Sequence, residues 1–298
     1  MTISRFVVFT TVLELRSFTK AATKLNMTQS AVSHAVSSLE SEWGATLLIR
    51  DRKKGLLLTE LGQKTVVHMR EILNRIEQIN QELAFASKLE AGTIRLGTFY
   101  SASACLLPKI LARFQKKYPN IEFLFFEGTY GEVVDWLETG IIDIGFIIES
   151  SASKTFEMLS LVKDEMVVAL PQGHRLGKRK IIEIEDIKEE PLIMPKGMYE
   201  PYILEIFKKA EIDPVVRFEV QDCTTIANMV QEGLGITIGP KLFLKTQRQL
   251  QLVHLAIENL RDVSLAYIAK PLVSPAVQAF LTEAGQIFNQ KDGAPTIQ

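Results

Sequence analysis

The chain has 298 residues, 47% of them hydrophobic, and a formal net charge of −1 at pH 7. This length allows about two domains of ordinary size, each with its own core. Apolar runs are short: Asp143 interrupts the run at 141–148, and none approaches the ~20 residues of a membrane-spanning helix. The first residues lack the pattern of a secretion signal. We therefore expect a cytoplasmic protein with no membrane partner.

The charge is unevenly distributed along the chain. Residues 1–59 hold eight Lys or Arg and four Asp or Glu, so the excess of acidic charge lies in the remainder. Neutralisation of phosphates is the sequence-independent part of DNA affinity. A basic head on an acidic body is thus typical of a molecule that contacts DNA through its head alone.

Residues 1–59 are predicted to form a helical DNA-binding domain. A helix over 3–15 supports two short helices joined by a tight turn, with Thr28 capping the second. In that helix Val32, Val36 and Leu39 recur at i, i+4 and i+7 and should be buried. Short donors and acceptors on its other face suit base edges or phosphates in a major groove. The expected DNA contacts here are Ser17, Thr19, Thr28, Gln29, Ser30, Ser33, His34 and Ser37.

Two apolar runs around a charged loop at 47–59 predict a β-hairpin or wing. Its basic tip, which includes Arg52 and Lys53, would lie beside a phosphate backbone, and an ordinary solvated loop is the alternative. Residues 60–90 then predict one long linker helix. Its apolar residues are spaced three and four apart, which is typical of a coiled-coil seam and favours dimerisation over packing on its own body. The expected seam is Met69, Ile72, Ile76, Ile79 and Leu83.

Residues 91–298 alternate strands and helices, which predicts an α/β domain of two similar lobes with parallel strands and crossover helices. Lobe 1 comprises 91–163 and 267–298, and lobe 2 comprises 164–266. A ligand should bind between them, because loops after strands face such clefts and helix N-termini offer free N–H groups. Each hydroxyl could instead be an ordinary cap. The expected contacts are Thr98, Ser101, Ser103, Thr129, Lys196, Gly197, Met198 and Thr224.

Catalysis finds little support in the sequence. The four histidines are scattered outside the known catalytic motifs, so we expect no catalytic residues, no cofactor and no enzyme. Cys105 and Cys223 are too few for a disulfide scaffold and too isolated for a zinc site. We therefore expect no metal, and a redox pair of these two cysteines is a minor alternative.

Two sets of residues match the pattern of one known family. The head contributes Phe18, Ala21-Ala22, Leu25, Thr28-Gln29, 31–33, Leu39-Glu40, Gly44, Leu47-Leu48, Arg50 and 58–62. The body contributes Leu107-Pro108, Glu127-Gly128, Leu137, Gly140, Asp143, Pro171, His174 and 233–236. With these residues the sequence resembles the LysR-type transcriptional regulators, and the resemblance covers essentially the whole chain.

The resemblance implies a winged helix-turn-helix, a linker helix and a two-lobed effector domain similar to periplasmic binding proteins. It also implies self-association as a dimer or a tetramer. Gln29, Ser33 and His34 would face bases or phosphates, with Arg50 and Arg52 reaching the flanking backbone. Two effector contacts would be Ser101 and Thr129, opposite 196–198. Ser30 stands where many members have proline, and His34 where many have arginine, which weakens the case for a bidentate guanine contact.

The favoured interpretation is a transcription regulator that binds double-stranded promoter DNA. A small-molecule co-inducer, with a carboxylate as the favoured class, would bind between the lobes and alter DNA bending, and RNA polymerase is a further expected partner. The main alternative is a constitutive repressor or architectural protein with a vestigial cleft. A more remote alternative is a solute-binding or enzymatic α/β protein with a fortuitous helical head.

Overall fold

The computed structural model describes residues 2–51, 55–86, 91–148, 156–197, 199–257, 260–268 and 273–288. Internal contacts divide the chain into two units, residues 1–92 with 138–141 and residues 93–137 with 142–298. Across the described ranges, no helix has the length and apolarity needed to cross a membrane.

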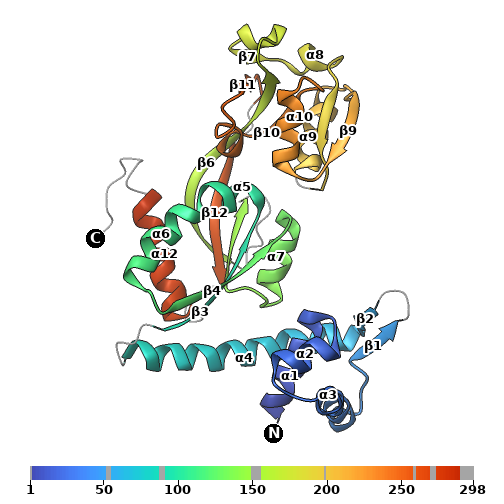
Figure 1. The fold of residues 1–298 in the computed structure, drawn as a ribbon, viewed down its shortest axis with the longest axis vertical. Helices are drawn as coiled ribbons and strands as arrows, with labels where there is room; N and C mark the ends of the chain where they lie inside the picture. Colours follow the sequence, from blue (N-terminus) through green and yellow to red (C-terminus); the bar gives the residue numbers. More distant parts are fainter. Residues whose placement is uncertain are drawn as a thin grey trace. The chain divides into compact units, whose positions relative to one another are not determined.

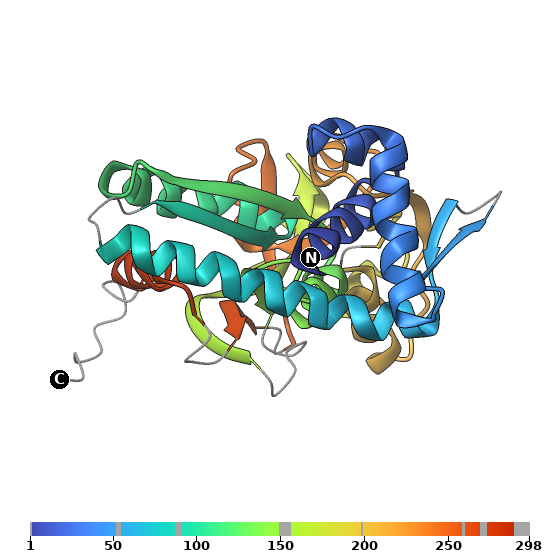
Figure 2. The same cartoon turned by 90° about the horizontal axis from the view of Figure 1, so that it is seen from below.

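The first unit begins with three helices, α1 (Thr2–Leu15), α2 (Phe18–Lys24) and α3 (Gln29–Trp43). An antiparallel hairpin of β1 (Leu48–Asp51) and β2 (Gly55–Leu58) follows, and then the long helix α4 (Glu60–Ala86). Figure 2 shows α1 to α3, in dark blue, gathered at the start of the cyan helix α4. The helices expected over 3–15 and after Thr28, and the wing hairpin, are therefore confirmed.

Local hydrogen bonds explain where the helices of the head begin and end. The Thr28 hydroxyl accepts from the backbone N–H of Ala31 at 3.1 Å, and the Ser17 hydroxyl accepts from that of Lys20 at 3.2 Å. Such caps satisfy N–H groups that have no partner within the helix. Gly44 ends α3 in the left-handed conformation at φ 61°, which glycine adopts without steric cost.

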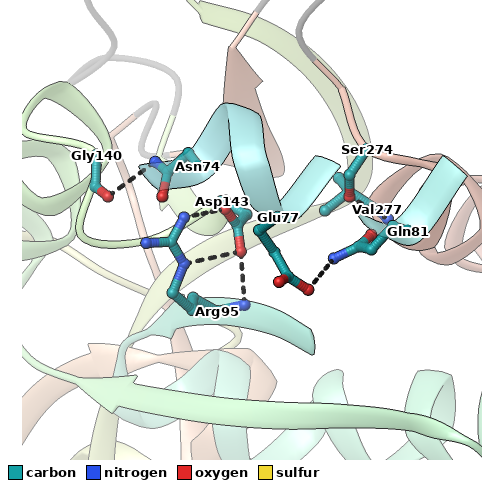
Figure 3. A network of polar contacts seen from close by, with 8 residues as sticks. All are labelled: Asn74, Glu77, Gln81, Arg95, Gly140, Asp143, Ser274 and Val277. Carbon is teal, nitrogen blue, oxygen red and sulfur yellow. Dashed lines mark hydrogen bonds and ion pairs between the residues drawn. The ribbon is translucent and has the colours of Figure 1, made fainter. Parts of the chain in front are cut away.

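Helix α4 is fastened to the head at its first turns. Gly62 lies so close to the hairpin that a Cβ on it would sit 2.2 Å from the Leu47 carbonyl oxygen. Met69 is buried in the same core as Phe9 and Leu39. The prediction that Met69 lies on the dimer seam is wrong, because the apolar face of this part of α4 packs into the core of the head. Later in α4, Asn74 Nδ2 donates to the Gly140 carbonyl at 3.3 Å (Figure 3).

Lobe 1 of the second unit is a sheet in the order β4-β3-β5-β12-β6. Within it, Arg95 on β3 pairs with Asp143, which precedes β5 (Figure 3). In its core, the ring centroids of Phe114 on α6 and Phe280 on α12 lie 5.4 Å apart. The elements are β3 (Gly92–Thr98), α5 (Tyr100–Cys105), α6 (Leu107–Lys117), β4 (Ile121–Glu127), α7 (Tyr130–Glu138), β5 (Ile144–Ile148), β6 (Phe156–Pro171), β12 (Leu260–Ile268) and α12 (Pro275–Phe288).

Lobe 2 surrounds a second core that includes Met166, Ile193 and Phe207. Its strand β8 pairs in parallel with β9, and both β10 and β11 pair with the second half of β6. The elements are η2 (Arg175–Lys178), β7 (Ile181–Ile182), α8 (Ile184–Ile187), β8 (Leu192–Pro195), α9 (Glu200–Lys209), β9 (Val216–Val220), α10 (Cys223–Gln231), β10 (Thr237–Pro240), α11 (Lys241–Leu244) and β11 (Leu250–Leu255).

The expectation of parallel strands with crossover helices is confirmed for part of this unit only. Strands β3 and β5 are parallel, but β12 is antiparallel to both β5 and β6. In Figure 1, β6 and β12 run from one lobe into the other, so the chain passes between the lobes twice and in opposite directions. These two strands are the continuous connection between the lobes, and both extend past the predicted lobe boundaries at 163/164 and 266/267.

Candidate DNA-binding surface and ligand pocket

Helix α3 has the two contrasting faces that the sequence predicts. Val32, Val36 and Leu39 are 0%, 3% and 0% exposed and form its inner face. Among the predicted DNA contacts, Ser33 is half-buried and the others on α3 are exposed, namely Gln29, Ser30, His34 and Ser37. The outer face therefore offers a hydroxyl-rich polar surface to a partner.

Several of the predicted DNA contacts also have structural roles. Ser17 and Thr28 cap their helices, and the Thr28 hydroxyl lies 3.0 Å from that of Ser30. Thr19 is exposed on α2. The side chain of Arg50, and the whole of Arg52 and Lys53, lie outside the described residues.

Glu40 positions the wing beside α3. Its Oε1 accepts from the backbone N–H groups of Leu47 at 2.7 Å and Leu48 at 3.0 Å. One carboxylate thereby joins the last turn of α3 to the start of the hairpin. Sequence reasoning included Glu40 in the family signature but assigned it no role, because its partners are backbone groups that no residue pattern reveals.

Beyond Met69, the predicted seam of α4 remains largely accessible. Ile72, Ile79 and Leu83 are 43%, 57% and 63% exposed, and Ile76 is half-buried. Large apolar side chains exposed along one helix are typical of a surface that another chain covers.

The second unit contains a cavity of about 330 Å³, within the usual range for small-molecule sites. Both lobes contribute to its wall. The predicted residues that line it are Ser101, Thr129, Lys196 and Gly197. The remaining lining residues are Phe99, Tyr100, Glu127, Gly128, Tyr130, Glu132, Tyr199, Gln221 and Asp222.

Other predicted effector residues have different positions. Thr98 is buried and its hydroxyl donates to the Phe99 carbonyl, while the Ser103 hydroxyl donates to the Tyr100 carbonyl. Neither lines the cavity. The Thr224 hydroxyl lies 2.5 Å from that of Tyr100, so it joins lobe 2 to lobe 1 next to a lining side chain. Met198 lies outside the described residues.

Ser101 carries a buried hydroxyl that has no partner among the described residues of this cavity. It is 3% exposed, and its Oγ has no hydrogen-bond partner among the described residues. Buried hydroxyls nearly always have a partner, because an unsatisfied one costs free energy. Since Ser101 lines the cavity, a bound molecule can supply the missing hydrogen bond.

Three other residues of the cavity wall, Thr129, Lys196 and Gly197, have donors that are already engaged by carboxylates. Glu132 Oε2 accepts from the Thr129 N–H at 2.8 Å and from its hydroxyl at 2.9 Å, which lowers the pKa of Glu132. The Gly197 N–H donates to Glu200 at 3.0 Å. Lys196 pairs with Glu219, and its pKa is raised by that hydrogen bond.

A buried polar network connects the cavity to the strands between the lobes. Tyr130 accepts at its hydroxyl from Arg261 Nη1 at 2.8 Å, and Arg261 Nη2 donates to Asp164 Oδ2 at 2.6 Å. The side chains of Arg261 and Asp164 are 4% and 3% exposed. Arg261 lies on β12 and Asp164 on β6. Sequence reasoning missed this pair, because one charged residue in each of two distant strands carries no spacing signal.

The two cysteines lie in environments that favour the protonated thiol. Burial raises the pKa of Cys223 to about 11, and its Sγ lies 3.6 Å from the Tyr199 hydroxyl. Burial also raises the pKa of Cys105, whose Sγ donates to the Leu242 carbonyl at 3.3 Å. Over the described ranges, no three His, Cys, Asp or Glu residues gather as a metal site would require.

Both units match models of known protein families. Residues 3–63 match the model of the bacterial regulatory helix-turn-helix protein of the lysR family, and residues 87–288 match the LysR substrate binding domain. The chain belongs to the LysR family. It is a DNA-binding transcription regulator with a substrate-binding domain. A curated relative, the uncharacterized HTH-type transcriptional regulator YvbU of Bacillus subtilis strain 168, is 38% identical over 97% of this chain and 99% of its own.

Solved structures of LysR regulators share the fold. Full-length CbnR complexed with its target DNA matches with a TM-score of 0.65 at 20% identity, over 96% of this chain and 99% of that one. The effector binding domain of QuiR in complex with shikimate matches with a TM-score of 0.59 at 25% identity, over 67% of this chain and 98% of that one. The predicted winged helix-turn-helix and two-lobed effector domain are confirmed.

Proposed function

We propose that this LysR-family regulator binds promoter DNA through α3 and the wing, and changes DNA bending when a small molecule binds between the lobes. The observation that carries the proposal is the buried hydroxyl of Ser101 in the wall of a ligand-sized cavity, which has no hydrogen-bond partner within the described part of the chain. The likeness to the effector binding domain of QuiR, which was solved with shikimate, supports it. A ligand can act only through different affinities for the two states of the regulator.

Base reading is assigned to Gln29, Ser33 and His34, with phosphate contacts from Arg50 and Arg52. The exposed polar face of α3 supports the first part of this assignment.

Self-association as a dimer or tetramer is assigned to α4, where Ile79 and Leu83 are the most exposed apolar residues of the predicted seam. RNA polymerase remains an expected partner. The carboxylate class expected from the sequence remains a prediction, with Ser101 and Lys196 as groups that could contact it.

DNA recognition is tested by selecting binding sites for the full chain from a random DNA pool. Replacing Gln29 and Ser33 with alanine should reduce affinity for the selected site by about 1–3 kcal/mol for each good base contact that the substitution removes, with a smaller change on random DNA. Ser41→Ala, at the exposed far end of the same helix, is the matched control. Equal reductions on both DNAs would refute base reading by these residues.

Effector binding is tested by a thermal-shift screen of metabolites against the wild type, Ser101→Ala and Ser103→Ala. Both variants remove one hydroxyl from α5, but only Ser101 lines the cavity. A true effector should stabilise the wild type and Ser103→Ala more than Ser101→Ala, and should alter the DNase footprint on the selected site. If every stabilising compound leaves the footprint unchanged, the constitutive regulator with a vestigial cleft is the correct interpretation.

A further inference from the structure

The wall of the cavity combines aromatic rings with carboxylates. Its aromatic residues are Phe99, Tyr100, Tyr130 and Tyr199, and its acidic residues are Glu127, Glu132 and Asp222. Among the described residues, Lys196 is the single Lys or Arg that lines it, and Glu219 already pairs with that ammonium. The wall therefore carries an excess of negative charge beside several aromatic side chains.

Two acidic groups of the wall, Glu132 and Asp222, are held in their charged form. The pKa of Glu132 is lowered by the backbone N–H and hydroxyl of Thr129. The hydroxyl and N–H of Thr225 each donate to Asp222 at 2.7 Å and lower its pKa. Because these hydrogen bonds favour the ionised carboxylates, both carboxylates stay charged at neutral pH.

An anionic ligand would meet two obstacles in this cavity. The donors that could hold it on Thr129 and Gly197 already bind the chain's own Glu132 and Glu200. It would also have to lie beside three carboxylates, and like charges at close range repel. An anion would thus gain a hydrogen bond from Thr129 or Gly197 only by displacing an internal carboxylate.

A ligand with a positively charged nitrogen would meet complementary groups instead. Ammonium N–H groups donate, and the buried Ser101 Oγ and the carboxylates can all accept. Cations are also attracted to the faces of Tyr and Phe rings, which is how aromatic cages recognise organic ammonium groups. Ser101 Oγ, for which the described ranges supply no hydrogen-bond partner, is an observation independent of the acidic groups, and it also favours a ligand in this cavity.

We propose that the effector of this protein is an organic ammonium compound, with its charged nitrogen near Glu127 and Asp222 and its apolar skeleton against the aromatic rings. This inference rests on the proposed function and names the ligand class of the same cavity. An amino carboxylate satisfies both this assignment and the carboxylate expected from the sequence. A simple carboxylate does not.

Three probes of nearly equal shape test the charge assignment: phenylethylamine, 2-phenylethanol and phenylacetate, titrated into the full chain at millimolar concentration by calorimetry and NMR. The amine should bind at least about tenfold more tightly than the alcohol or the acid. Tighter or equal binding of phenylacetate overturns the ammonium class but leaves the proposed function standing, because the cavity then still takes a ligand.

Two variants locate the charge that recognises the amine. Glu127→Gln and Asp222→Asn should each weaken phenylethylamine binding by about fivefold or more, and asparagine can still cap α10. Glu122→Gln, an exposed residue on the same strand β4 that does not line the cavity, should leave it unchanged. Equal weakening in all three variants overturns the assignment to this cavity. Failure of all three probes to bind also overturns the ammonium class. The proposed function is tested separately, by the thermal-shift screen of Ser101→Ala and Ser103→Ala.

Discussion

Replacing Asp164 with alanine should destabilise the effector-binding unit by about 3–5 kcal/mol, because it leaves a buried guanidinium without its counter-charge. The Asp164 carboxylate accepts from Arg261 at 2.6 Å and from the backbone N–H groups of Leu242 at 2.8 Å and Glu165 at 3.0 Å. Arg261 and Asp164 are 5% and 4% exposed, so water cannot readily replace the missing carboxylate.

Thermal unfolding of the full chain, followed by circular dichroism at neutral pH, measures this destabilisation. A domain of about 150–250 residues shifts by roughly 2–4 °C per kcal/mol, so the transition of this unit should fall by about 6–20 °C. Glu205→Ala is the control. Its partner Lys209 lies four residues along α9, and both side chains are more than half exposed, so no resolvable shift is expected.

The double variant Asp164→Leu with Arg261→Met separates charge from packing. Replacement of a buried ion pair by apolar residues is often neutral or stabilising, so the double variant should be clearly more stable than Asp164→Ala. A transition of Asp164→Ala within about 2 °C of the wild type would refute the reasoning, since it would mean that the charge is not effectively buried.

Three further predictions concern other parts of the chain. Gly62→Ala should cost about 1–3 kcal/mol in unfolding measurements, since its Cβ would meet the Leu47 carbonyl, whereas Gly131→Ala meets nothing within 4 Å and should be tolerated. Ile79→Glu should lower the mass measured by ultracentrifugation, and an unchanged mass would contradict dimerisation through α4. Cys223, with its pKa near 11, should react slowly with iodoacetamide at pH 7, and rapid labelling would favour the redox alternative. Stability should fall between pH 9 and 11, where the unfolded thiol ionises first.

Where side-chain periodicity is strong, prediction from sequence succeeded. The buried face of α3 follows directly from the spacing of Val32, Val36 and Leu39. Short helices such as α5 and α11 are not predicted from the sequence, because their six and four residues span less than two full helical turns. The sequence also placed Met69 on a seam, although the head core needs the same apolar face.

The amino-acid sequence was sufficient to identify the head, the linker helix and the loops that surround the cavity, because periodicity, caps and family signature are properties of neighbouring residues. The tertiary structure alone decided which hydroxyls reach the cavity, how β6 and β12 cross between the lobes, and that Arg261 and Asp164 meet although they are 97 residues apart. Those features depend on contacts between distant segments. Hydrogen bonds to backbone groups and the burial of charge carry no local pattern, so only the folded chain reveals them.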